Sequence, residues 1–372
     1  MYNLISNADI NVLTKVKNSS VISKFTNNNI KYNETHTELL VGTNDNYPSY
    51  IDINDNKILL KYYIKSELPY LFKIISVEKA LSIQVHKNVL EYNNNLITTK
   101  QDILIALSRF EILYKFRELE DIKKFLINIE ELQNLIYDKV SLNLFISNPS
   151  KILLKKIFKS FIQAPDELVD YNIINLFNTI NKKKEKTNLD ILICKLITLH
   201  NNIEIFYPYF INYIQLNKGE SINIDINEPY SYIYGECIKC LSQSEYTIRV
   251  NLNKKDKKEK NIIYHILSYN CGYPQINYGY KKNNYTILYK TAFNELNIEY
   301  IIINNDNKLY SLSIQNTYSI LIVLSGRGFI ISHNKYKYLL VGTIIYLENN
   351  VDCKITCTSQ YEKLILYRIF KQ

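Results

Sequence analysis

The chain has no tryptophan, one methionine, eight glycines and seven prolines among its 372 residues. Asparagine, lysine, isoleucine and tyrosine are abundant instead, which is typical of a coding bias. Such a bias weakens secondary-structure propensity as a guide, because asparagine-rich loops and isoleucine-rich cores both follow from it. Periodicity and the order of motifs are therefore the better guide to the fold.

The sequence also lacks the features of membrane and secreted proteins. No apolar run approaches the roughly eighteen residues that a membrane-spanning helix needs. Residues 1–4 lack the charged and then apolar regions of a secretory signal, so we expect none. The six cysteines show no disulfide spacing of a small scaffold, which favours reduced thiols and a cytoplasmic protein.

Two cysteine pairs are weak candidates for a metal site. Cys237 and Cys240 form a lone CxxC pair, and Cys353 and Cys357 are spaced differently. A structural zinc site would need a second pair or nearby histidines, so a metal at either pair is the minority interpretation.

The net charge of +9 is concentrated in two basic runs, residues 182–186 and 254–260. Such runs are usually solvated loops, and a nucleic acid or a protein partner could bind them. No aromatic-interleaved nucleic-acid motif accompanies the runs, so binding through them is the minority interpretation.

The chain is predicted to be mainly β with an α-helical insertion, in two or three structural units. Residues 1–110 are expected to form mostly strands, including 38–43 and 57–64. Between residues 111 and 213 the apolar spacing becomes helical. Helices are expected over 116–129 and 152–161, from 165, and over 189–200, with Pro149 at a first helical position.

Strands return from residue 213 and dominate the last third of the chain. Residues 319–324, 329–332 and 342–347 favour a small β-sandwich or barrel. Gly326-Arg327-Gly328 could suggest a phosphate loop, but no helix is expected after it, so a hairpin turn is favoured.

The segment Leu81 to His86 alternates between apolar and polar residues. Leu81, Ile83 and Val85 would enter a core, while Ser82, Gln84 and His86 would face the other way. An amide oxygen and an imidazole two residues apart can bind one metal ion. Taken alone, such a strand is more often a solvated face.

Several segments, in collinear order, resemble the type I mannose-6-phosphate isomerases, which are zinc-dependent cupin enzymes that interconvert mannose 6-phosphate and fructose 6-phosphate. Residues 37–43 resemble AELWMGT, and residues 68–73 with 80–86 resemble LPFLFK and ALSIQAH. Further matches lie at 105–119, at 219–230, which resembles GE…NEPH, and at 244–250.

The resemblance implies two cupin-like β-barrel (jelly-roll) domains plus a helical domain. The metal-site cupin domain would be discontinuous, comprising residues 1–110 and 214–270. The helical insertion would span 111–213, and a C-terminal cupin-like domain would span 271–372.

The resemblance also implies a site. Zinc would be bound by Gln84, His86, Asp102 and, doubtfully, Tyr230. The matching catalytic positions are Arg249, Lys100, Lys255 and Glu38, and the substrate-binding positions are Ser82, Lys100 and Arg249.

Two positions depart from the family pattern. Tyr230 stands where the family has a histidine ligand, and a neutral phenol is a poor zinc ligand. Lys239 replaces an acidic residue and reverses the charge. Two hypotheses follow. The chain is an isomerase that moves a proton between C1 and C2 through an enediol, with a sugar phosphate as its partner. Alternatively, it is an inactive descendant that serves as a binding or interaction module.

Simpler roles exist for the same residues. Arg249 could lie on a strand surface, and Lys100, Lys239 and Lys255 could be solvated. Asp102 could serve as a cap or turn residue, and the Tyr230 ring could fill the space of a lost ligand.

Overall fold

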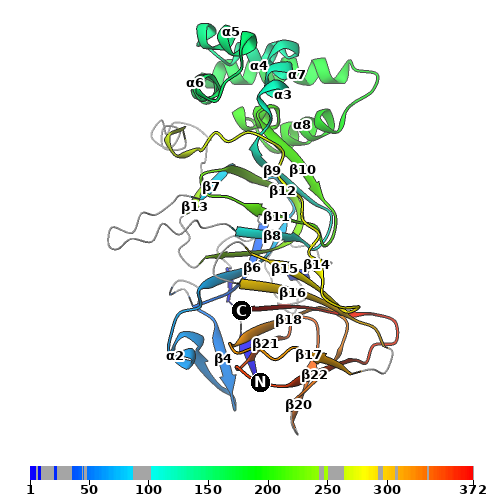
Figure 1. Cartoon of the computed structure of the whole chain (residues 1–372). Helices are drawn as coiled ribbons and strands as arrows, with labels where there is room; N and C mark the ends of the chain where they lie inside the picture. The colour runs from blue at the N-terminus through cyan, green and yellow to red at the C-terminus, as the bar shows by residue number, and fades with distance from the viewer. Residues whose placement is uncertain are drawn as a thin grey trace.

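The computed structural model describes residues 1–5, 7–9, 21–22, 36–43, 45, 48–86, 102–242, 247–249, 264–291, 296–305, 309–332 and 335–371. Within them the chain is mainly β, and most helices lie together at one end (Figure 1). The site strands occupy the middle and the C-terminal strands the opposite end. Each helix in this described part is too short or too polar to cross a membrane.

The helical part follows strand β9 and precedes strand β10. It comprises α3 (Leu119–Asn128), α4 (Glu130–Asn134), α5 (Lys139–Ser147), α6 (Lys151–Ile162), α7 (Asp166–Asn181), α8 (Asn188–Leu199) and the 3-10 helix η1 (Ile203–Tyr209).

Local capping explains several of the helix starts. Thr187 and Asp190 form a capping box at α8. The Ser150 side chain caps α6, so the prediction that Pro149 is the first helical residue was wrong. A serine hydroxyl can accept from an orphan helix amide, and this sets the first helical residue at Lys151, two residues later.

The site region is a sheet of ten described strands. Its strands are β2 (Asn7–Asp9), β3 (His36–Val41), β6 (Tyr70–Val77), β7 (Gln84–His86), β8 (Asp102–Ala106), β9 (Phe110–Phe116), β10 (Ile211–Leu216), β11 (Ser221–Ile224), β12 (Pro229–Ser242) and β13 (Thr247–Arg249).

Strand β12 joins the two halves of this sheet. Residues 229–234 pair with β7 and β9, and residues 235–242 pair with β6 and β8. The change occurs at Gly235, where φ is +106° and a Cβ atom would lie 2.3 Å from the Arg109 carbonyl oxygen. Only glycine fits this bend.

Buried side chains divide the site region into two faces. Ile75, Leu104, Tyr230 and Cys237 belong to an interior cluster enclosed by the two halves of the sheet. On the outer face, residues such as Ile74 pack against the C-terminal strands.

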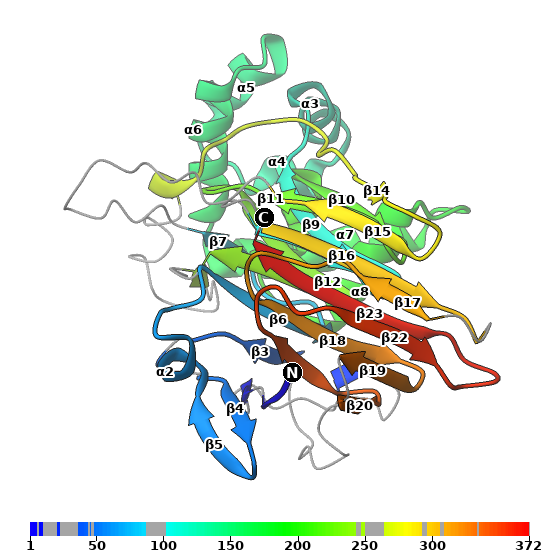
Figure 2. The same cartoon turned by 60° about the horizontal axis from the view of Figure 1, so that its bottom comes forward.

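The C-terminal region contains two further sheets. The described strands of the larger one are, in spatial order, β14 (Tyr280–Lys281), β15 (Thr286–Lys290), β16 (Leu296–Ile303), β23 (Leu364–Lys371), β18 (Ser319–Ser325), β21 (Ile344–Leu347), β1 (Tyr2–Ile5), β4 (Tyr50–Ile53) and β5 (Asn56–Leu59). Figure 2 shows β15, β16, β23 and β18 side by side. The smaller sheet runs β17 (Tyr310–Leu312), β22 (Cys353–Cys357), β19 (Gly328–Ser332) and β20 (Lys335–Leu339).

Two sequence predictions fail in these strands. The extended segment predicted over 57–64 ends at Leu59, and helix α2 (Leu60–Ile64) follows it. The turn at Gly326 is not a hairpin, because β18 and β19 belong to different sheets. At Gly326 the chain crosses from the larger sheet to the smaller one. The hydrophobic pattern of each strand alone cannot distinguish such a crossing from a hairpin.

Candidate active site

Three neighbouring strands place the sequence-predicted residues in a row. Tyr230 on β12 lies directly opposite Gln84 on β7, and Gln84 lies opposite Arg249 on β13. Residues in register across strands share one face of the sheet. The row therefore places a phenol, an amide and the Arg249 backbone position side by side.

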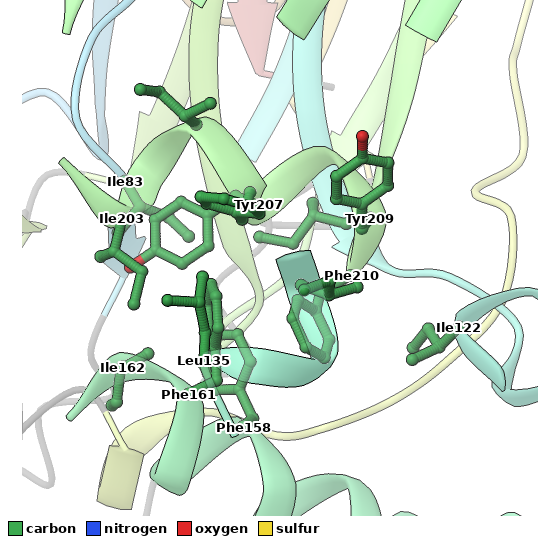
Figure 3. Close-up of a cluster of buried hydrophobic side chains, with 14 of the residues drawn as sticks. Ile83, Ile122, Leu135, Phe158, Phe161, Ile162, Ile203, Tyr207, Tyr209 and Phe210 are labelled. Carbon is green, nitrogen blue, oxygen red and sulfur yellow. The ribbon is translucent and has the colours of Figure 1, made fainter. Parts of the chain in front are cut away.

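The predicted alternation of Leu81 to His86 is only partly correct. The regular strand is confined to Gln84–His86. Ile83 and Val85 enter the helical core, where Ile83 lies near Ile203 and Tyr207 (Figure 3). Leu81 packs instead against the interior cluster, because the chain before Gln84 is not a strand and its alternation breaks there.

The bend in β12 brings two residues of one strand together. The Tyr230 hydroxyl accepts a hydrogen bond from the Lys239 ammonium at 3.4 Å, although the residues are nine apart in sequence. A straight strand would separate them by roughly 30 Å, since each residue rises about 3.3 Å. The Gly235 bend is what makes the site possible.

Lys239 lies at the centre of a polar cluster formed with His86, Asp102 and Tyr230, which we call the lysine cluster. Its Nζ atom is 2.9 Å from His86 Nε2 and 3.1 Å from Asp102 Oδ2. His86 Nε2 is also 2.7 Å from Asp102 Oδ2. Three polar atoms from three strands thus converge on one ammonium group.

Aromatic rings enclose this ammonium group. Its Nζ atom lies 5.0 Å from the centroid of the Tyr230 ring and 5.9 Å from that of Tyr232. The Tyr230 ring in turn stacks on His86 at 4.9 Å. A cation over aromatic faces is stabilised by the ring quadrupole, especially where water is excluded.

Burial makes the charges of the lysine cluster interdependent. Lys239 is 2% exposed and Asp102 5%. Burial alone would raise the pKa of Asp102, but the Lys239 charge and His86 outweigh it and lower that pKa. Each buried charge therefore requires its partner.

The residues present do not fit zinc with Lys239 in this position. Zinc holds nitrogen and oxygen donors at about 2.0–2.2 Å, which in a tetrahedron places them roughly 3.3 Å apart. His86 Nε2 and Asp102 Oδ2 are closer, at 2.7 Å, and the Lys239 cation contacts both. The described residues contain no group of three or more His, Cys, Asp or Glu side chains arranged for a metal.

Glu38 forms a second buried ion pair beside the lysine cluster. Its Oε2 atom is 3.1 Å from Lys73 Nζ, and both side chains are less than a tenth exposed. Lys73 lies opposite Lys239 on the adjacent strand. Sequence reasoning missed Lys73 as a site residue. The available signal was that Lys73 ends the motif Leu68–Lys73 and lies two residues before the buried Ile75, on the same side of the strand.

Ser82 and the remaining candidates have separate surroundings. The Ser82 hydroxyl hydrogen-bonds Glu204 in η1, and burial raises the pKa of Glu204 to about 7. Gln84 is buried on β7. Lys100 and Lys255 lie outside the described residues, as does basic run 254–260. For Arg249 only the strand position is described.

The structure also describes the CxxC pair and the first basic run. Cys237 belongs to the interior cluster and Cys240 to the outer face, so their side chains lie on opposite sides of β12. The run 182–186 is exposed between α7 and α8, where Lys183 pairs with Asp190 at 2.7 Å.

Comparisons with known proteins agree with this architecture. The family model "Phosphomannose isomerase type I, catalytic domain" matches residues 13–119. "Mannose-6-phosphate isomerase 2" of Arabidopsis thaliana is 25% identical over 80% of this chain and 71% of its own length. A "Probable mannose-6-phosphate isomerase" of Dictyostelium discoideum is 28% identical over 77% of this chain and 67% of its own.

Solved structures share the fold over the whole chain. A zinc-bound mannose 6-phosphate isomerase superposes with a TM-score of 0.80 at 17% identity, covering 100% of this chain and 99% of the other. A mutant of phosphomannose isomerase from Salmonella typhimurium gives the same TM-score, identity and coverage.

Proposed function

Because the chain is a divergent relative of the type I phosphomannose isomerases, we propose that it interconverts mannose 6-phosphate and fructose 6-phosphate. Its partner is then a sugar phosphate. We further propose that its two β regions are cupin-like jelly-rolls, that the helical insertion belongs to the first of them, and that the protein works in the cytoplasm. Strands β1, β4 and β5 pair within the larger C-terminal sheet, so the expectation that all of residues 1–110 belong to the metal-site domain was wrong.

The reaction is an internal redox exchange that needs no external oxidant. A base removes the proton at C2, the electron pair forms a C1–C2 double bond, and the C1 carbonyl oxygen takes a proton. Reprotonation at C1 with loss of the O2 proton gives the ketose. A positioned base and a cation beside the developing oxyanion are therefore required.

The chain's own residues supply candidates for each role. Glu38 is a buried carboxylate that could move the proton. Arg249 and Lys100, with Ser82, would bind the substrate, and Lys255 would stabilise charge. Arg249 carries most weight here because its backbone lies in register with Gln84 at the lysine cluster.

The observation that carries the proposal is the convergence of His86, Asp102, Tyr230 and Lys239 from separate strand segments within a shared fold. A buried cation paired with a carboxylate and an imidazole is the kind of group that an enediol mechanism needs. The second candidate is a non-catalytic binding module, for which the burial of Lys239 and Tyr230 is the relevant observation.

A coupled assay for fructose 6-phosphate formed from mannose 6-phosphate tests the proposal. We expect turnover by the wild-type chain and a loss of about 100-fold in Arg249→Met. Arg109→Met is the matched control, because the Arg109 side chain is 64% exposed at the surface. No turnover by a folded wild-type chain would reject the isomerase and favour the binding module.

A further inference from the structure

The lysine cluster holds a cation of its own. The Lys239 ammonium lies within 3.4 Å of an imidazole nitrogen, a carboxylate oxygen and a phenol oxygen. A lysine ammonium has three N–H donors and no acceptor, and the acceptor atoms around it include these three. The distances are those of hydrogen bonds and close ion pairs, not of metal bonds.

Lys239 Nζ lies beside both partners of the His86–Asp102 contact. It is 2.9 Å from His86 Nε2 and 3.1 Å from Asp102 Oδ2, and those two atoms are 2.7 Å apart. The tautomer of His86 decides whether Nε2 donates to Asp102 or accepts from Lys239. In either tautomer the ammonium neutralises the buried carboxylate.

Tyr230 also favours an ammonium group at this position. Its ring stacks on His86 and lies under the ammonium, and its hydroxyl accepts from Lys239. A neutral phenol is a poor zinc ligand, but its face and its oxygen both favour an ammonium group. Lys239 and Tyr230, the two departures from the family pattern, therefore stabilise each other.

We propose that Lys239 takes the place of the metal ion in this chain, so that the site binds no zinc and the isomerisation proceeds without it. The catalytic part of this inference rests on the proposed function. Its N–H donors face His86, Asp102 and Tyr230, so its role in the reaction is electrostatic: its positive charge stabilises the negative charge that develops on the oxygens at C1 and C2. It donates hydrogen bonds and keeps its protons, so the transfer of protons described above is unchanged.

The first experiment uses the wild-type chain alone. The protein is incubated with excess zinc, passed through gel filtration and analysed by inductively coupled plasma mass spectrometry, and isomerase activity is measured with and without a chelator. We expect well below one zinc per chain and activity that the chelator leaves unchanged. One tightly bound zinc per chain would overturn the inference.

The two readouts separate the inference from the proposed function. A zinc-free, inactive chain would reject the isomerase while leaving the lysine-filled site in place. An active chain that holds zinc and loses activity with the chelator would reject the inference alone. An inactive chain that binds zinc would reject both.

Two variants sharpen the result. Lys239→Met should lower kcat about 100-fold without gaining zinc, because Tyr230 is still a poor ligand. The double variant Lys239→Glu with Tyr230→His should gain one zinc per chain, because it restores an acidic residue and an imidazole. Failure of the double variant, in folded form, to bind zinc would contradict the claim that these two residues exclude the metal.

Lys282→Met is the matched control for Lys239→Met. Lys282 also pairs with a buried carboxylate, at 2.8 Å from Glu299, but lies in the C-terminal region away from the lysine cluster. It should leave kcat unchanged. Circular dichroism and the melting temperature identify any variant that fails to fold, and the wild-type measurements remain decisive in that case.

Discussion

Two regions of the molecule each bury a cation against a carboxylate, with different surroundings. In the C-terminal region, Arg368 donates to Ser319 and Ser313 and lies 3.6 Å from Glu299, which is fully buried. Glu299 also contacts Lys282. The partners of these charged groups are serine side chains and a backbone carbonyl, which is typical of an ion pair with a purely structural role. We call the group of Arg368, Glu299 and Lys282 the structural tie.

The lysine cluster has partners of another kind. Lys239 contacts an imidazole and a phenol, and the His86 side chain is 12% exposed, so the cluster reaches the surface through it. The comparison teaches that burial of an ion pair does not identify a site. The chemistry of the atoms around the cation does.

The largest expected effect is in the structural tie. Arg368→Met should lower the free energy of unfolding by about 3–5 kcal/mol, because it removes one of two cations from the buried Glu299. Chemical denaturation measures the change. A loss below about 1 kcal/mol would mean that Lys282 alone neutralises Glu299.

Glu204 extends the comparison to a buried carboxylate whose Oε1 atom has no hydrogen-bond partner among the described residues. Burial raises its pKa to about 7. Because the folded state then holds its proton more tightly than the unfolded state, Glu204's contribution to stability is present below about pH 4.5 and is lost as the pH rises to about 7.

The Glu204 contribution should be on the order of 3 kcal/mol across that pH range. Denaturation of the wild type and of Glu204→Gln at several pH values measures it. The variant should lack this part of the pH dependence. Parallel curves for the two proteins would show that Glu204 does not titrate there.

Breaking the lysine cluster should cost less than breaking the structural tie. Lys239→Met should lower the free energy of unfolding by about 2 kcal/mol, because Asp102 keeps His86 beside it. Adding Asp102→Asn to the variant should recover part of the loss, and a double-mutant cycle measures the coupling. Additive losses would contradict a direct Lys239–Asp102 interaction.

The smallest effect is expected at the phenol oxygen. Tyr230→Phe removes a long 3.4 Å hydrogen bond but keeps the ring that stacks on His86. Its cost should be about 0.5–1 kcal/mol. Tyr230→Ala is the comparison variant, and it should cost several times more because the buried ring is lost.

Much of the fold followed from the sequence. The helical spacing of 116–129 and 189–200 corresponds to α3 and α8, and residues 38–43 lie largely within β3. The family resemblance also implied that Asp102 and Tyr230 lie near His86. These features are local patterns or carried by collinear motifs.

The contacts of Lys239 could not be predicted in the same way. Its charge reversal was visible, but its reach to His86 depends on the bend at Gly235 and on two halves of β12 pairing with different strands. The crossing at Gly326 was missed for the same reason, because neither flanking segment encodes which sheet it joins. The helix at Leu60 was missed because its start has no capping side chain that the sequence could show.

Anomalous diffraction at the zinc edge, from crystals of the wild-type chain grown with zinc, tests the central claim most directly. The account predicts no anomalous peak among Gln84, His86, Asp102 and Tyr230, and Lys239 Nζ in hydrogen-bond contact with His86 Nε2. A strong peak at that position, with the Lys239 side chain displaced, would contradict it.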